Sequence, residues 1–84
     1  MNTLHKLHIV ATCPEDDTTD IYWAEIECGG RLLPVAAIHD AIEEATEEPI
    51  YQEQLTKRLA ALLGVTVRTR GTHSGIRTEC EARQ

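Results

Sequence analysis

The spacing of apolar residues changes twice along the chain, and this change constrains the fold more than any other feature of the sequence. Residues 21–28, IYWAEIEC, place Tyr22, Ala24, Ile26 and Cys28 at every second position, which is the period of a β-strand. Between residues 35 and 63 the apolar residues recur at helical spacing instead. After Gly64 the segment VTVRTR indicates a strand again. Strands that precede and follow a pair of helices predict an α+β domain.

The predicted elements, in chain order, are a strand over 4–12, a polar loop over 14–20, a strand over 21–28, a helix that begins at Pro34 and ends before Pro49, a second helix that ends at Gly64, a strand over 65–70, a turn over 71–75 and a strand over 76–82. This β-β-α-α-β-β order predicts two hairpins that form one four-stranded antiparallel sheet, with both helices packed on one face. We expect residues 1–84 to form a single domain.

Both predicted helices have an apolar stripe. The stripe residues are Val35, Ile38, Ala41, Ile42 and Ala45 in the first helix and Leu55, Leu59, Leu62 and Leu63 in the second. On the predicted strands, Arg68 and Arg70 share a face with Arg77, Glu79 and Glu81, so we expect ion pairs between the last two strands.

The composition excludes several classes of protein. A net charge of −6 argues against non-specific nucleic-acid binding and against an anionic membrane surface. No apolar run approaches the roughly 18 residues of a transmembrane helix, and the N-terminus MNTLHKLH contains no signal-peptide core. Three widely spaced cysteines are typical of reduced thiols, so we expect a cytoplasmic protein. With no Phe and one Trp the core is thin, which favours burial of a further face against another subunit.

The segment YQEQLT, residues 51–56, carries the most specific signal. It opens the second helix and is followed by GVTV at residues 64–67. Together with the order and lengths of the elements, these residues resemble the T-fold module of GTP cyclohydrolase I, dihydroneopterin aldolase and 6-pyruvoyl-tetrahydropterin synthase. The resemblance spans nearly the whole chain, and it implies a homo-oligomer whose ligand sites lie between subunits.

In the cyclohydrolase and aldolase families a glutamate at the position of Glu53 anchors a purine or pterin ring. The chemistry is sound, because a carboxylate accepts hydrogen bonds from a ring N–H and an exocyclic amine at once. Tyr51 is the expected aromatic neighbour that stacks on the ring. The alternative is that Glu53 is an ordinary acid in the first helical turn, where it interacts favourably with the helix dipole.

The same resemblance raises the question of zinc. His5, His8 and His73 correspond to the zinc ligands of GTP cyclohydrolase I, and three imidazoles with one open position are compatible with a catalytic zinc site. Against this, two strand residues three apart point to opposite faces, and exposed histidines near a terminus need no function. No other cofactor is expected.

The catalytic groups of these enzymes are largely missing. The proton-transfer histidines of GTP cyclohydrolase I correspond to Leu7 and Gly71, so the resemblance implies ring binding without the full catalytic machinery and favours a protein that is not an enzyme. The alternative function is a non-enzymatic accessory or inhibitor protein that binds another protein. Its binding surface would consist of the acidic end of the first helix, EEATEEP at 43–49, and Trp23. The alternative for Trp23 is that the indole is half-buried and only packs against the first loop.

Overall fold

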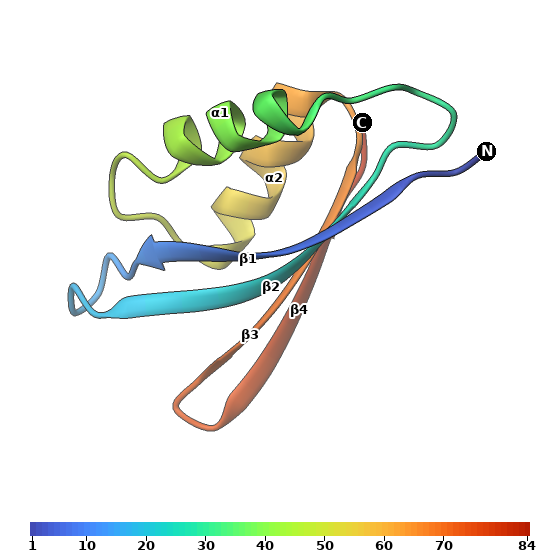
Figure 1. Ribbon diagram of the computed structural model, residues 1–84. Helices are drawn as coiled ribbons and strands as arrows, with labels where there is room; N and C mark the ends of the chain where they lie inside the picture. Colours follow the sequence, from blue (N-terminus) through green and yellow to red (C-terminus); the bar gives the residue numbers. More distant parts are fainter.

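The computed structural model describes residues 1–84 as one antiparallel sheet with two helices (Figure 1). The elements are β1 (Leu4–Thr12), β2 (Thr19–Glu27), α1 (Val35–Ala45), α2 (Gln52–Leu63), β3 (Thr66–His73) and β4 (Ile76–Ala82). The strands lie in the order β1-β2-β3-β4, and both helices lie on the same face of the sheet (Figure 1). The predicted α+β architecture and its β-β-α-α-β-β order are confirmed. Neither helix has the length and apolar run that crossing a membrane requires.

The helix-facing side of the sheet forms the core. Tyr22, Ala24, Ile26 and Cys28 are each at most 4% exposed, as their alternation predicts. They pack with residues of the helices and of β3, including Leu55, Leu59, Ala60 and Val67. Helix α2 contacts β3, β4 and α1. The core is therefore aliphatic, with Tyr22 as its one buried aromatic ring.

Two residues of the predicted apolar stripes lie outside the core. Leu62 is 44% exposed, because Leu59 and Leu63 occupy the side of α2 that faces the sheet. Val35 is 57% exposed, since it is the first residue of α1 and precedes the turn at which the helix meets the core. Pro34 is the N-cap of α1 and not its first helical residue, whereas Gly64 ends α2 in the left-handed conformation, as predicted.

The last hairpin is longer than predicted. Strand β3 continues through Gly71 to His73, and the turn consists of Ser74 and Gly75, both at positive φ, which is the pattern of a tight two-residue hairpin. Position 71 requires a glycine, because the ring of Tyr22 packs against its backbone. A Cβ at position 71 would lie 2.6 Å from Tyr22 Cδ1.

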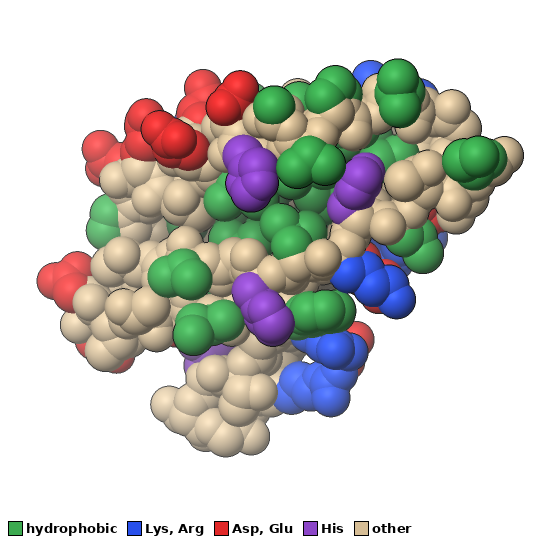
Figure 2. Space-filling model, in the orientation of Figure 1, with side chains coloured by type: hydrophobic (Ala, Val, Ile, Leu, Met, Phe, Trp, Pro, Cys, Tyr) green, Lys and Arg blue, Asp and Glu red, His purple; other side chains and the backbone are tan.

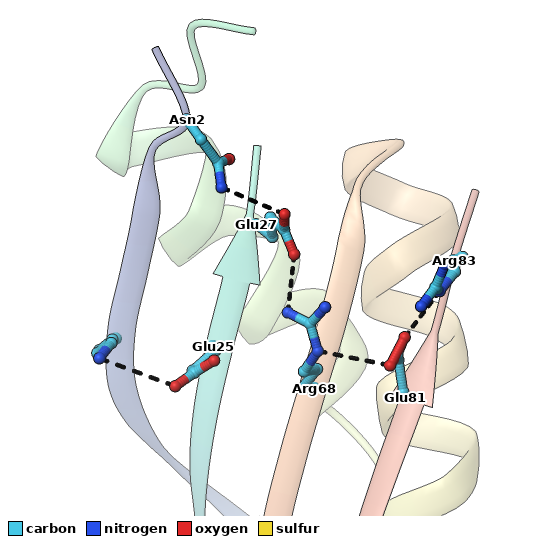
Figure 3. Close-up of polar contacts among 7 residues, drawn as sticks. Asn2, Glu25, Glu27, Arg68, Glu81 and Arg83 are labelled. Carbon is cyan, nitrogen blue, oxygen red and sulfur yellow. Dashed lines mark hydrogen bonds and ion pairs between the residues drawn. The ribbon is translucent and has the colours of Figure 1, made fainter. Parts of the chain in front are cut away.

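The helix-free face of the sheet carries rows of paired charges (Figure 3). Arg68 contacts Glu27 at 2.8 Å and Glu81 at 3.5 Å, and Arg77 contacts Glu79 at 3.4 Å. The predicted pairing between β3 and β4 is confirmed for Arg68 and Glu81, whereas Arg77 and Glu79 lie on the same strand. Each such exposed pair contributes little to the stability of the fold. Together the pairs make this face of the sheet charged, whereas the helix-facing side is apolar.

At one end of the sheet all four strands are paired, and we call this the closed end. At the other end the pairing between β2 and β3 is lost, and we call this the split end. Strands β1 and β2 pair over their full lengths, and so do β3 and β4 from Val67 to His73. The central pair β2–β3 stops at Trp23 and Arg70. Beyond that point the two hairpins diverge, with the β1–β2 and β3–β4 turns well separated (Figure 1).

Candidate functional site

A cavity of about 520 Å³ lies at the split end of the sheet, which is within the size range of small-molecule sites. Three segments meet there: the loop between β1 and β2, the first turn of α2, and the tip of the β3–β4 hairpin. The lining residues are Cys13, Pro14, Glu15, Asp16, Thr18, Asp20, Tyr22, Tyr51, Gln52, Glu53, Thr72, His73, Ser74 and Thr78. Hydrogen-bonding and ionisable groups dominate this lining.

Helix α2 begins at this cavity, and both predicted ring-binding residues line it. Tyr51 is the N-cap of α2, and its backbone N–H donates a hydrogen bond to Gln54 Oε1. The Tyr51 hydroxyl donates a 2.7 Å hydrogen bond to Glu15, and this bond raises the pKa of the tyrosine. Glu53 is exposed in the first turn and makes no ion pair, so its carboxylate is available to a ligand.

Gln52 is buried between these two residues, with 3% of its surface exposed. Its Nε2 donates to the Thr78 carbonyl at 3.0 Å and to the Thr69 hydroxyl at 3.1 Å. A carbonyl can only accept, so this contact fixes the amide orientation and leaves Oε1 facing away. Gln52 Oε1 is the one buried side-chain polar atom in the chain without a hydrogen-bond partner. Such a group costs free energy unless something donates to it.

Three side chains connect the two hairpins at the split. The Tyr22 hydroxyl donates to Asp20 Oδ2 at 3.2 Å and lies 3.4 Å from His73 Nε2. His73 Nδ1 lies 3.5 Å from Asp20 Oδ1. Burial, followed by the charge of Asp20, raises the pKa of Tyr22 well above its ordinary value, so the phenol stays protonated and continues to donate.

The loop between β1 and β2 is held in a compact turn that brings Cys13 to the cavity. The backbone N–H of Cys13 donates to the Thr18 carbonyl at 2.8 Å, and Asp17 adopts a left-handed conformation. Asp16 Oδ1 accepts from the hydroxyl of Thr18 at 2.7 Å and from its backbone N–H at 3.1 Å. These hydrogen bonds, with a smaller contribution from Cys13, lower the pKa of Asp16. A half-buried thiol and several carboxylates therefore share one cavity with Glu53.

The chain does not bring the three predicted zinc ligands together. His5 and His8 lie on opposite faces of β1, because the strand is regular and carries no bulge between them. The side chain of His73 instead contacts Asp20 and Tyr22. Within one chain, no group of three or more His, Cys, Asp or Glu side chains is placed to hold a metal ion.

The alternative prediction was a surface that binds another protein. Its acidic part is visible in Figure 2, where acidic side chains gather over the end of α1. Glu43, Glu44, Glu47 and Glu48 are all exposed there. Trp23 lies elsewhere, on the helix-free face of the sheet, where His8 and Arg70 flank it. The two parts of the predicted protein-binding surface are thus separate, and binding of another protein stays a prediction.

Sequence reasoning missed Cys13, Asp20 and Gln52 as site residues. Cys13 was interpreted only as a reduced thiol, and Asp20 was assigned to a polar loop although it lies in β2. The available signal for Gln52 was its position beside Glu53 at the start of a helix. For the other two the signal was weak, because their distance from Glu53 along the chain gives no indication that they share a cavity.

The architecture is that of the T-fold. A search of solved structures found a similar chain described as the archaeosine synthase QueF-Like in the apo form, with a TM-score of 0.82, 19% sequence identity, and coverage of 96% of this chain and 90% of that one. The likeness confirms the fold expected from YQEQLT and the element order. No family model matches the sequence, and no curated protein matches it.

Proposed function

We propose that the cavity at the split end of the sheet binds a purine- or pterin-like ring, anchored by Glu53. The observation that carries the proposal is the unpartnered, buried Oε1 of Gln52 in the same cavity as an unpaired Glu53. A carboxylate and a second unpartnered acceptor in one cavity are complementary to a ring that presents several N–H groups, as guanine and pterin do.

The surroundings of Glu53 support a flat, polar ligand. Tyr51 is half-exposed at the rim and offers a ring for stacking. On the opposite wall, Thr72 and Ser74 supply further hydrogen-bonding groups. The similar solved structure is named an archaeosine synthase, so a protein of the same fold acts in the chemistry of a modified nucleoside. That name supports a nucleobase-like ligand for this chain.

We further propose that the chain works as a homo-oligomer. Strands β1 and β4 are both edges of the sheet, and each presents an unpaired row of backbone groups. Several apolar side chains are also exposed, among them Val10, Ile21 and Leu62. Pairing of edges between copies would satisfy the backbone groups and bury part of this apolar surface.

Titration calorimetry with GTP, neopterin and 7-deazaguanine tests the ring site. We expect at least one of these to bind, and Glu53→Gln to weaken binding by about 10- to 100-fold, since it removes a charge-assisted pair. Glu44→Gln is the matched control, because it makes the same change of charge at an exposed site outside the cavity. No binding of any of the three rings, or equal affinities of the two variants, would refute the proposal.

A second candidate function is favoured by Cys13, whose side chain lines the same cavity. A thiol beside a bound ring can add to an unsaturated carbon of the ligand: the S–C bond forms, one π bond of the acceptor breaks, and its heteroatom takes up the proton that the thiol releases. The chain would then be an enzyme or a covalent binder in place of a reversible binding module.

Alkylation rates separate this candidate from simple ring binding. Iodoacetamide should modify Cys13 faster than Cys28, which is buried and whose pKa is raised by burial. A ring ligand bound at Glu53 should protect Cys13, and Cys13→Ser should retain reversible ring binding while losing any covalent adduct. Ring binding without protection of Cys13 would leave the first proposal intact and remove the second.

A further inference from the structure

We propose that the helix-free face of the sheet carries a separate binding site for a phosphate group, centred on Arg70 and Arg77. This site lies on the opposite face of the sheet from the side chains of Tyr22 and His73. The two sites share only Asp20 and Thr72 among their lining residues, and neither residue is changed in the test.

Arg70 differs from the other cations of this face in having no carboxylate partner. Lys6 contacts Glu25, and Arg68 contacts both Glu27 and Glu81. Arg70 lies directly across from Glu79 in the strand register, yet Glu79 is paired with Arg77 instead. In a chain with a net charge of −6, an exposed guanidinium without a carboxylate partner is a donor fork free for an external anion.

Trp23 holds this guanidinium in place. The Arg70 Cζ lies 5.5 Å from the centre of the Trp23 ring, within the range of a cation–π contact. His8 packs on the same indole from the other side, with ring centres 4.8 Å apart. His8, Trp23 and Arg70 are therefore three neighbours in one row across β1, β2 and β3. A guanidinium fixed in this way loses less side-chain entropy when it binds.

A hollow beside this row is lined by cationic side chains that can bind an anion. Arg70, Arg77 and His8 line it, together with Thr72 and a single acid, Asp20. Both carboxylate oxygens of Asp20 are directed to Tyr22 and His73, so this acid is already engaged at the split between the hairpins. Arg77 contacts Glu79 through Nε at 3.4 Å, so Arg70 is the unpaired guanidinium of the hollow and Arg77 contributes further N–H donors.

The ligand chemistry that fits is a phosphate group, because two planar guanidinium forks and an imidazole N–H match its oxygens. The phosphate can come from a free inorganic ion or from a nucleotide. Trp23 and the nearby exposed Ile21 add an apolar wall on which the base of a nucleotide could rest. Inorganic pyrophosphate, GMP and guanosine are therefore the three probes that distinguish these sources.

The fluorescence of Trp23 reports on this site directly, because it is the only tryptophan of the chain. We expect pyrophosphate and GMP to change Trp23 emission with saturation, and guanosine to leave it unchanged at the same concentrations. Arg70→Gln should weaken the binding of pyrophosphate, which has no ring, by at least about tenfold in calorimetry, as loss of one charge-assisted pair predicts. Arg58→Gln, the same change on the exposed face of α2, should alter affinity less than about twofold.

The outcomes are decisive in each direction. Stronger binding of GMP than of pyrophosphate would show that the apolar wall also contributes, and equal binding would show a site for the phosphate alone. Absence of any response to both phosphate compounds would overturn the proposal. So would equal losses in Arg70→Gln and Arg58→Gln, since binding would then reflect only the net charge.

Discussion

The two ends of the sheet are built in different ways. At the closed end all four strands are joined by backbone hydrogen bonds, and Arg68 contacts glutamates on both neighbouring strands (Figure 3). At the split end the backbone pairing between the hairpins has stopped, and the contacts of Tyr22 with Asp20 and His73 connect them. Regular pairing of the backbone provides stability, whereas its interruption leaves polar side chains free to line a cavity.

The difference explains where the candidate site lies. At the closed end, main-chain groups of the central strands are already satisfied and the helix-facing surface is filled by aliphatic side chains. At the split end, the start of α2 and the loop after β1 face the gap between the hairpins, and each contributes polar groups to it. The proposed ring site and the regularly paired part of the sheet therefore lie at different ends, and substitutions should separate their effects.

The largest effect is expected from Ile26→Ala at the closed end. Ile26 is fully buried on β2 and pairs with His5 on one side and Val67 on the other. Loss of three heavy atoms from a packed core should lower the free energy of unfolding by about 3 kcal/mol. Chemical denaturation measures this, and a loss below about 1 kcal/mol would contradict the closed end as the stable part of the molecule.

Gly71→Ala should have the next largest effect, and it acts at the split end. The new methyl group would lie 2.6 Å from Tyr22 Cδ1, so the tyrosine ring must move away from Asp20 and His73. We expect a loss of stability of about 2 kcal/mol and weaker ring binding. Gly75→Ala in the turn is a useful comparison, because it meets no neighbouring atom but is strained by its positive φ. It should reduce stability without changing the affinity for the ring.

Tyr22→Phe should change how stability depends on alkaline pH. The folded protein raises the pKa of Tyr22, so the folded state holds the phenolic proton more tightly than the unfolded state. This contribution is fully present below the ordinary pKa of about 10 and is lost as pH rises above it, by up to about 1.4 kcal/mol per pH unit. At neutral pH the variant should lose about 1 kcal/mol from the missing hydrogen bond.

Unfolding measured between pH 8 and 11 tests this, because the wild type should lose stability more steeply than Tyr22→Phe above about pH 10. Cys28 and Cys80 also have raised pKa values through burial, and they contribute equally to both proteins. Parallel curves would mean that Tyr22 ionises as freely in the folded state as in the unfolded state.

The smallest effect is expected from Arg68→Gln in the charge rows of the closed end. Its ion pairs with Glu27 and Glu81 involve side chains that are about one third exposed, so solvent screens them. The free energy of unfolding should fall by about 0.5 kcal/mol, and less at high salt. A loss above about 1.5 kcal/mol would show that side-chain charges, and not backbone pairing, hold this end together.

The candidate site was only partly predictable. Glu53 and Tyr51 could be identified because a local motif placed them at the start of a helix, and both line the cavity. Cys13 and Asp20 could not, since their approach to Glu53 depends on how the β1–β2 hairpin lies against α2. The histidines show the reverse case: His5, His8 and His73 were grouped by resemblance, and the alternation of β1 places the first two on opposite faces.

The sequence by itself determined the elements and their order, because strand and helix periods are local properties of a few consecutive side chains. It also determined which face of β2 is buried, since alternation assigns every second residue to the core. The tertiary structure alone decided where the sheet splits. That depends on how far two strands that are distant in the sequence, β2 and β3, remain paired, and their pairing stops at Trp23 and Arg70.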